Sequence, residues 1–164
     1  MKLLTLTRHA KSDWDNNLSD FFRPLNKRGN SDAPMLAKFL SQKLPVPDLM
    51  ISSAAERAKQ TTLYFAPAFG YEIGEIVFEK ELYHCGTRDF VNVLSSVSPK
   101  RQHVMLFAHN PGITEFQYYL SGSLISNMAT SGTAHIELYI DTWKEISQGC
   151  GRLRHYYYPA MLKK

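Results

Sequence analysis

The chain has few cysteines, no long apolar run and no strong excess of charge. Its 164 residues include two cysteines, Cys85 and Cys150, which form neither a C-x-x-C motif nor a disulfide framework. The first apolar run, residues 3–7, is too short for a signal peptide, and no stretch approaches membrane-spanning length. The formal net charge of +4 is too small and scattered to indicate nucleic-acid binding. These absences predict a cytoplasmic protein with no membrane or nucleic-acid partner.

Motifs for binding metals or nucleotide phosphates are also missing. The sequence contains no HExxH motif, no carboxylate cluster with metal-ligand spacing and no glycine-rich phosphate loop. We therefore expect an activity that needs no metal or other cofactor. Repeats, low-complexity tracts and flexible linkers are absent too, so the length predicts a single domain over residues 1–164.

Short apolar segments alternate with segments of helical periodicity. Strands or extended segments are predicted at residues 3–7, 49–51, 76–78, 104–108, 134–140 and 153–158. Helices are predicted from an N-cap at Ser31 to about residue 43, from a capping box at residues 53–56 to before Pro67, from an N-cap at Thr87 to before Pro99, and over residues 113–120. The alternation predicts an α/β fold with a mostly parallel sheet.

Three basic side chains closely follow predicted strands. His9 comes after the first strand, Arg57 lies in the first turn of the helix after the second, and His109 directly follows residues 104–108. Ligands of open parallel sheets bind outside the carboxyl ends of the strands, so these residues should meet at one rim. With Arg8 they make a set that suits a small dianion, because a guanidinium can hold two phosphoryl oxygens at once.

Arg8 and His9 are adjacent, which two cations would disfavour unless His9 is neutral. Arg8 should lower the pKa of His9 below its reference value of about 6.5, leaving a neutral ring nitrogen as nucleophile. Arg8, Arg57 and a cationic His109 could then stabilise the charge on the equatorial oxygens of a transferring phosphoryl group. Attack by His9 would form a phosphohistidine intermediate that water hydrolyses.

Several segments, in order, resemble the motifs of one family. Arg8-His9-Ala10 is similar to the Arg-His-Gly signature of the histidine phosphatase (phosphoglycerate-mutase-like) superfamily, and residues 52–61 and 108–109 resemble its later motifs. The SixA-type phosphohistidine phosphatase branch is resembled more closely, through RHAKSDW (8–14), RPLNKRG (23–29), LYH (82–84) and HNPG (109–112). This resemblance implies a three-layer α/β/α sandwich with a phosphoglycerate-mutase-like fold.

The resemblance also implies roles for individual residues. His9 would be the phosphate acceptor, and Arg8, Arg57 and His109 would bind the phosphoryl group. Arg23 is either a substrate contact or an ordinary exposed loop arginine. Where many family phosphatases carry a carboxylate proton donor, this sequence has His84, which is either the proton donor or a wall of the pocket.

The missing carboxylate bears on the substrate. Imidazole, whose conjugate acid has a pKa of about 6.5, leaves more easily than an alkoxide, which needs strong protonation. The first hypothesis is therefore a metal-independent phosphatase for phosphohistidine on a protein, such as a histidine-containing phosphotransfer domain. One alternative is a phosphatase of small phosphomonoesters, with His84 or Glu81 as the acid. The other is a non-catalytic module that binds phosphorylated ligands.

Overall fold

The computed structural model describes residues 1–15 and 17–163; Asn16 and Lys164, which the single-domain prediction includes, lie outside the described residues. Within the described part, six strands form one sheet in the order β3-β2-β4-β1-β5-β6. The strands are β1 (Lys2–Arg8), β2 (Leu49–Ser53), β3 (Val77–Glu79), β4 (His103–Ala108), β5 (Thr133–Leu138) and β6 (Gly151–Tyr157). β5 runs antiparallel to both of its neighbours and the other pairs are parallel, which confirms the mostly parallel sheet.

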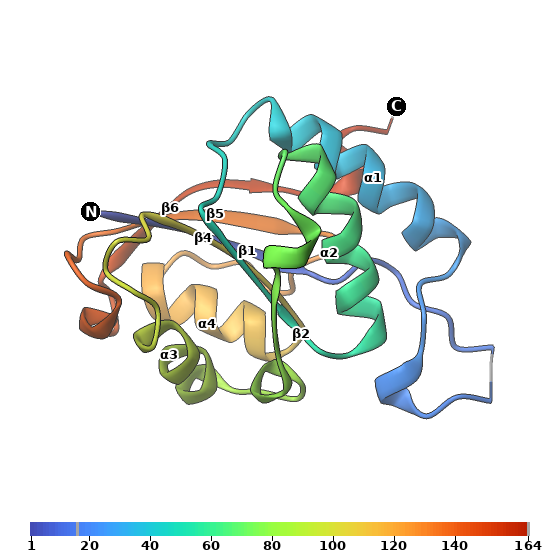
Figure 1. Cartoon of the computed structure of the whole chain (residues 1–164), viewed down its shortest axis with the longest axis horizontal. Helices are drawn as coiled ribbons and strands as arrows, with labels where there is room; N and C mark the ends of the chain where they lie inside the picture. The colour runs from blue at the N-terminus through green and yellow to red at the C-terminus, as the bar shows by residue number, and fades with distance from the viewer. Residues whose placement is uncertain (16, 164) are drawn as a thin grey trace.

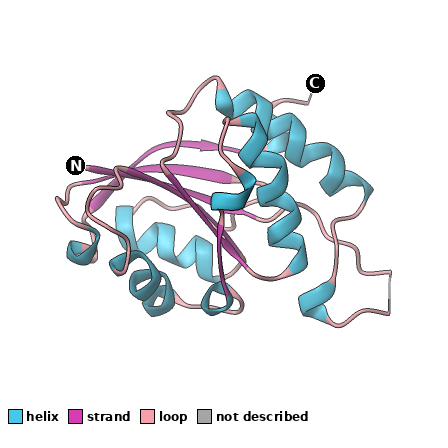
Figure 2. Ribbon diagram, viewed as in Figure 1, coloured by secondary structure: helices cyan, strands magenta, loops and turns pink. Residues whose placement is uncertain are grey.

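Helices cover both faces of the sheet. They are α1 (Lys27–Ser41), α2 (Glu56–Ala68), α3 (Thr87–Ser95) and α4 (Gly112–Ser121), with short 3-10 turns between several elements. α1 and α2 lie on one face, and α3 and α4 lie on the other (Figure 1), so the three-layer α/β/α prediction is confirmed. Figure 2 shows the helices on either side of the strands. No helix in the described part of the chain is long and apolar enough to cross a membrane.

The sheet is buried on both faces, and its central strand β4 is apolar from residue 104 to residue 108. In β4, Met105 and Phe107 pack into the core under α1 and α2, whereas Val104 and Leu106 pack into the core under α3 and α4. A strand covered on both faces has a continuous apolar sequence rather than an alternating one, as the run at residues 104–108 does. This double burial leaves the ends of the strands as the natural place for polar side chains.

The predicted start of the first helix is wrong. α1 begins at Lys27, and the Asn26 side chain accepts the N–H of Gly29 at 2.9 Å, so Asn26 rather than Ser31 is the N-cap. The first turn has no apolar residues at helical spacing, so the hydrophobic periodicity of the sequence did not indicate this turn. Gly29 is needed there, since a Cβ at this position would lie 2.1 Å from the carbonyl oxygen of Lys11.

Two other predicted helix caps also differ in the structure. Ala55, which has no capping side chain, precedes α2, so the capping box expected at residues 53–56 is absent from that helix start. The Ser53 hydroxyl instead contacts the Nε2 of His109 at 2.7 Å, so this side chain binds His109 and does not cap the helix. In α3, Thr87 is the first helical residue, and the Asp89 carboxylate accepts the N–H of Gly86 at 2.9 Å.

Candidate active site

The candidate site lies where β1, β2 and β4 end. Arg8 pairs with Ala108 in the parallel register, so His9 and His109 emerge side by side, with ring centroids 5.0 Å apart. α2 begins shortly after β2 ends and brings Arg57 to the same edge. The Arg57 Nε lies 3.3 Å from the Nε2 of His9. The structure thus brings the four residues of the predicted rim together.

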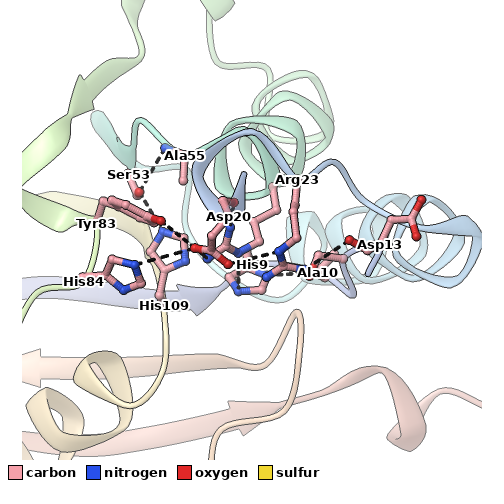
Figure 3. A network of polar contacts seen from close by, with 12 residues as sticks. His9, Ala10, Asp13, Asp20, Arg23, Ser53, Ala55, Tyr83, His84 and His109 are labelled. Atoms are coloured by element: carbon pink, nitrogen blue, oxygen red, sulfur yellow. Dashed lines mark hydrogen bonds and ion pairs between the residues drawn. The ribbon is translucent and has the colours of Figure 1, made fainter. Parts of the chain in front are cut away.

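The backbone and ring of His9 are held on three sides. Its N–H donates to the Ala108 carbonyl oxygen, its carbonyl oxygen accepts from the Ser131 N–H, and each bond is 3.1 Å long. The ring Nδ1 lies 2.7 Å from the Ala10 carbonyl oxygen. A carbonyl oxygen can only accept, so Nδ1 carries the ring proton and Nε2 carries the lone pair. The lone pair points to the guanidinium of Arg57 (Figure 3 shows His9 within this network).

His9 is neutral because it is buried beside positive charge. Only 6% of the residue is exposed, and burial, with smaller contributions from the charges of Arg57 and Arg8, lowers the pKa of the ring to about 3. The predicted lowering of the His9 pKa is confirmed in direction. The predicted cause was Arg8 alone, whereas burial is the larger cause. A neutral imidazole nitrogen is nucleophilic, whereas a protonated one is not.

The prediction of a cationic His109 is wrong for the free protein. Burial, together with the neighbouring His9 and Arg57, lowers the pKa of His109 to about 2. Its Nε2 lies 2.7 Å from the Ser53 hydroxyl, and its Nδ1 is buried without a hydrogen-bond partner in the described part of the structure. A neutral ring still has one N–H, so His109 can donate a hydrogen bond to a bound anion without carrying a charge.

Arg8 contributes a guanidinium nitrogen that has no hydrogen-bond partner among the described residues. Its Nη1 donates to the Met128 carbonyl oxygen at 2.8 Å, which fixes the guanidinium. Its Nε is buried and makes no hydrogen bond within the described residues. Buried donors are nearly always paired in native proteins, so an orphaned guanidinium N–H beside His9 is suited to an anionic ligand.

Asp20 is a part of the site that the sequence argument missed. Its main-chain carbonyl oxygen accepts from the Nη1 of Arg57 at 2.7 Å, and its Oδ2 lies 3.1 Å from the Nη2. Oδ1 accepts from the Nε of Arg23 at 3.1 Å, and the Tyr83 hydroxyl donates to Oδ2 at 2.6 Å. The sequence signal that could have indicated a role for Asp20 is its position three residues before Arg23 in a short turn.

The carboxylate of Asp20 is ionised in this environment. Burial alone would raise its pKa, but the hydrogen bond from Tyr83 and the charge and hydrogen bond of Arg57 outweigh burial and hold the pKa well below its usual range. A group of this kind accepts hydrogen bonds and does not supply a proton at neutral pH.

Arg23 is not an ordinary exposed loop arginine. It is only 6% exposed, its Nη1 donates to the Ser12 hydroxyl at 2.6 Å, and its guanidinium carbon lies 3.5 Å from the centre of the Trp14 ring. These contacts place Arg23 in the wall of the site, with Trp14 stacked on its outer side. The reading of Arg23 as a solvated surface charge is therefore excluded.

His84 lies at the mouth of the site. Its side chain is 69% exposed, its Nε2 is 3.6 Å from the Oδ2 of Asp20, and its ring centroid lies 3.9 Å from that of Tyr83, with the two planes tilted by 40°. Its backbone has a φ of 53°, which is unusual for a residue with a side chain. Glu81, the other candidate acid, lines a different depression together with Glu79 and Asp89.

These side chains enclose a cavity of about 210 Å³. Its lining includes the six residues predicted from the sequence, namely Arg8, His9, Arg23, Arg57, His84 and His109. Within the described part of the chain, Asp20 is the one carboxylate in the lining, against three arginines and Lys11, so the cavity favours anions. Among residues 1–15 and 17–163, no three His, Cys, Asp or Glu side chains are grouped to hold a metal ion.

The sequence is similar to a family of known proteins. The family model described as histidine phosphatase superfamily (branch 1) matches residues 4–85, half of the chain. An uncharacterized chloroplastic protein of Arabidopsis thaliana is 32% identical over 151 residues, which cover 87% of this chain and 69% of that protein.

Solved structures agree with this family match. The candidate phosphohistidine phosphatase SixA of Agrobacterium tumefaciens superimposes with a TM-score of 0.82 at 28% identity, covering 96% of this chain and 98% of that one. The protein histidine phosphatase SixA complexed with tungstate has the same fold, with a TM-score of 0.82 at 22% identity and coverage of 98% and 99%. The chain therefore belongs to the histidine phosphatase superfamily, branch 1, and is similar within it to the SixA-type proteins.

Proposed function

We propose that this phosphatase moves the phosphoryl group of a protein phosphohistidine first to His9 and then to water. One observation carries the proposal. The Nε2 of His9 is unprotonated and lies 3.3 Å from the guanidinium of Arg57, inside a cavity lined by positive charge. A phosphoryl group entering this cavity would meet a nucleophile and its charge-stabilising partners at the same place.

The proposed reaction has two displacements. In the first, the lone pair of Nε2 forms the new bond to phosphorus while the bond to the substrate nitrogen breaks. Arg8 and Arg57 stabilise the negative charge on the equatorial oxygens, and His109 donates its N–H to one of them. In the second, water attacks phosphorus while the P–N bond breaks and its electron pair returns to Nε2. Both protons of the water leave with the product as dihydrogen phosphate, and His9 is regenerated with its original proton on Nδ1.

The groups that could donate a proton in the cavity favour cleavage of a P–N bond over cleavage of a P–O bond. An ester leaves as an alkoxide and needs an acid beside it. In the described lining the one carboxyl group is Asp20, whose low pKa keeps it ionised. Imidazole leaves as a weak base and does not need a carboxylic acid.

The size and position of the cavity favour a substrate carried by a protein. Its volume of about 210 Å³ is below the range of roughly 300–1,000 Å³ that is usual for small-molecule sites. Trp14, at its edge, is 70% exposed, so a protein surface could cover the mouth while one phosphorylated side chain reaches in. A histidine-containing phosphotransfer domain would present its phosphohistidine in this way, and the solved relative from Agrobacterium tumefaciens is named a candidate phosphohistidine phosphatase.

A small phosphomonoester is the second candidate substrate. The observation in its favour is the pair of His84 and Asp20, 3.6 Å apart, because a protonated His84 at the mouth could protonate an oxygen leaving group. His84 therefore stays the candidate proton donor for that reaction.

The test is a parallel assay of phosphate release from a phosphohistidine protein and from an aryl phosphate. We expect the wild-type kcat/KM to be higher for the P–N substrate, and His9→Ala to abolish turnover of both. Preference for the ester would establish the second candidate instead. Tight binding of the phosphoprotein without phosphate release would indicate the non-catalytic module.

A further inference from the structure

One guanidinium connects the nucleophile of this site to a carboxylate. The Nε of Arg57 lies 3.3 Å from the Nε2 of His9, while its Nη2 lies 3.1 Å from the Oδ2 of Asp20. Asp20 is thus one guanidinium's width from the attacking nitrogen. Its side chain is 38% exposed, so the carboxylate borders both the cavity and the solvent at its mouth.

A carboxylate is at first sight a poor neighbour for a phosphoryl dianion, because like charges repel. Here the groups that face it are Tyr83, Arg57, Arg23 and His84, all of them donors or potential donors. Tyr83, Arg57 and Arg23 keep the carboxylate ionised, so it accepts hydrogen bonds and does not release a proton. An ionised acceptor at this place cannot itself protonate an oxygen leaving group, but it can accept a hydrogen bond from a leaving group that carries its own N–H.

A phosphorylated imidazole is such a leaving group. Phosphorus is bonded to one ring nitrogen, and the other nitrogen can carry a proton. If it does, breaking the P–N bond releases neutral imidazole; if it does not, the ring must leave as a far more basic anion. A carboxylate that accepts a hydrogen bond from a ring N–H stabilises the protonated ring, as the Asp–His pair of serine hydrolases does.

We propose that Asp20 is a specificity-determining residue that accepts a hydrogen bond from the remote ring nitrogen of the substrate's phosphohistidine. This inference rests on the proposed function and deepens it. In the first displacement the P–N electron pair returns to the substrate ring, which leaves neutral and keeps the proton it brought. Asp20 starts and ends the step as a carboxylate. Phosphate esters have no such N–H, so their leaving group gains no hydrogen bond from Asp20.

Asp20 also orients Arg57 and Arg23, and this structural role must be separated from the selective one. Loss of orientation would weaken phosphoryl binding for every substrate to a similar degree. Loss of the hydrogen bond to the leaving ring affects only phosphoimidazole substrates. The ratio of kcat/KM for the two substrate classes therefore reports the selective role alone.

The experiment compares Asp20→Asn with the wild type on a phosphohistidine protein, on phosphoimidazole and on an aryl phosphate. We expect the ratio of P–N to P–O kcat/KM to fall by about ten- to a hundredfold, the range for losing one hydrogen bond to a charged group. Tyr83→Phe removes one donor from the carboxylate but keeps its charge, so it should leave the ratio near the wild-type value. Asp20→Glu, which keeps the charge, should restore part of the ratio.

Two outcomes would overturn the inference, and they differ in what they say of the proposed function. If the wild type prefers the P–N substrate and Asp20→Asn keeps the same ratio, only the role of Asp20 is wrong. If the wild type prefers the ester, the role of Asp20 and the proposed function are both wrong. Asp20→Ser provides a second neutral variant if Asp20→Asn does not fold.

Discussion

At the scale of single residues, Arg57 organises the site. Its side chain is 5% exposed, with the Nε directed to His9 and both Nη atoms bound to Asp20. This geometry needs a planar group with donors on two sides, which a lysine ammonium does not have. The charge at this position was predictable from the sequence. The orientation was not, because it depends on Asp20, far away in the chain.

Arg57→Lys should impair the reaction although the positive charge remains. The ammonium cannot hold Asp20 and face His9 at the same time, so we expect kcat/KM to fall by about 10- to 100-fold, equivalent to ~1.4–2.7 kcal/mol. Steady-state assays on the phosphohistidine substrate measure this loss. Arg28→Lys, at an arginine whose side chain is 60% exposed, is the matched control and should change kcat/KM by less than about twofold. Equal effects of the two substitutions would show that the fork geometry of Arg57 is not needed.

At the scale of elements, the site depends on where strands end and helices begin. The apolar runs of the sequence placed the strand ends well, because a run buried on both faces must stop where polar groups begin. Helix starts were predicted less well, since Asn26 and Gly29 depend on contacts with a distant loop. Asp20 and Tyr83 were missed for the same reason, because their functional neighbours come from other segments of the chain.

The contact between α1 and the loop after β1 can be tested at Gly29. Alanine is normally about 1 kcal/mol better than glycine inside a helix. A Cβ at Gly29 would lie 2.1 Å from the Lys11 carbonyl oxygen, so the backbone must shift. We expect Gly29→Ala to destabilise the protein by about 1–3 kcal/mol, as overpacking does.

Urea unfolding measures the stability of Gly29→Ala. The control is Gly74→Ala, where an added Cβ meets nothing within 4 Å and stability should change by less than about 1 kcal/mol. Stabilisation by Gly29→Ala would mean that the approach of Lys11 is not a tight constraint.

At the scale of the whole molecule, several histidines are buried in the neutral form. The hydroxyl of Thr5 lies 2.7 Å from the Nε2 of His103 and 2.8 Å from the Nδ1 of His135, so a polar cluster crosses the central strands. Burial, with smaller contributions from neighbouring charge, lowers the pKa of each of these two rings to about 4. With His9 and His109, four rings resist protonation in the folded state.

Stability should therefore fall as the pH drops below about 6.5, the pKa of an unfolded histidine. Above that pH both states are neutral and these rings contribute no pH dependence. Between about pH 6.5 and pH 4 the unfolded state binds protons that the folded state does not, so acid favours unfolding.

The measurement is urea unfolding at a series of pH values. His103→Gln should reduce the slope of unfolding free energy against pH by up to about 1.4 kcal/mol per pH unit, the value for one proton. Asn92→Gln on the exposed side of α3 is the control, because it removes no titratable group and should leave the slope unchanged. An unchanged slope in His103→Gln would contradict a neutral, buried His103.

The account depends most on phosphoryl transfer to the Nε2 of His9. Rapid quenching of the wild type during turnover of a phosphohistidine protein, followed by mapping of the labelled phosphate, tests this step directly. We predict acid-labile, alkali-stable phosphate bonded to the Nε2 of His9, formed and lost at rates that match turnover. Phosphate on another side chain, or turnover with no phosphorylated enzyme at any time, would contradict the account.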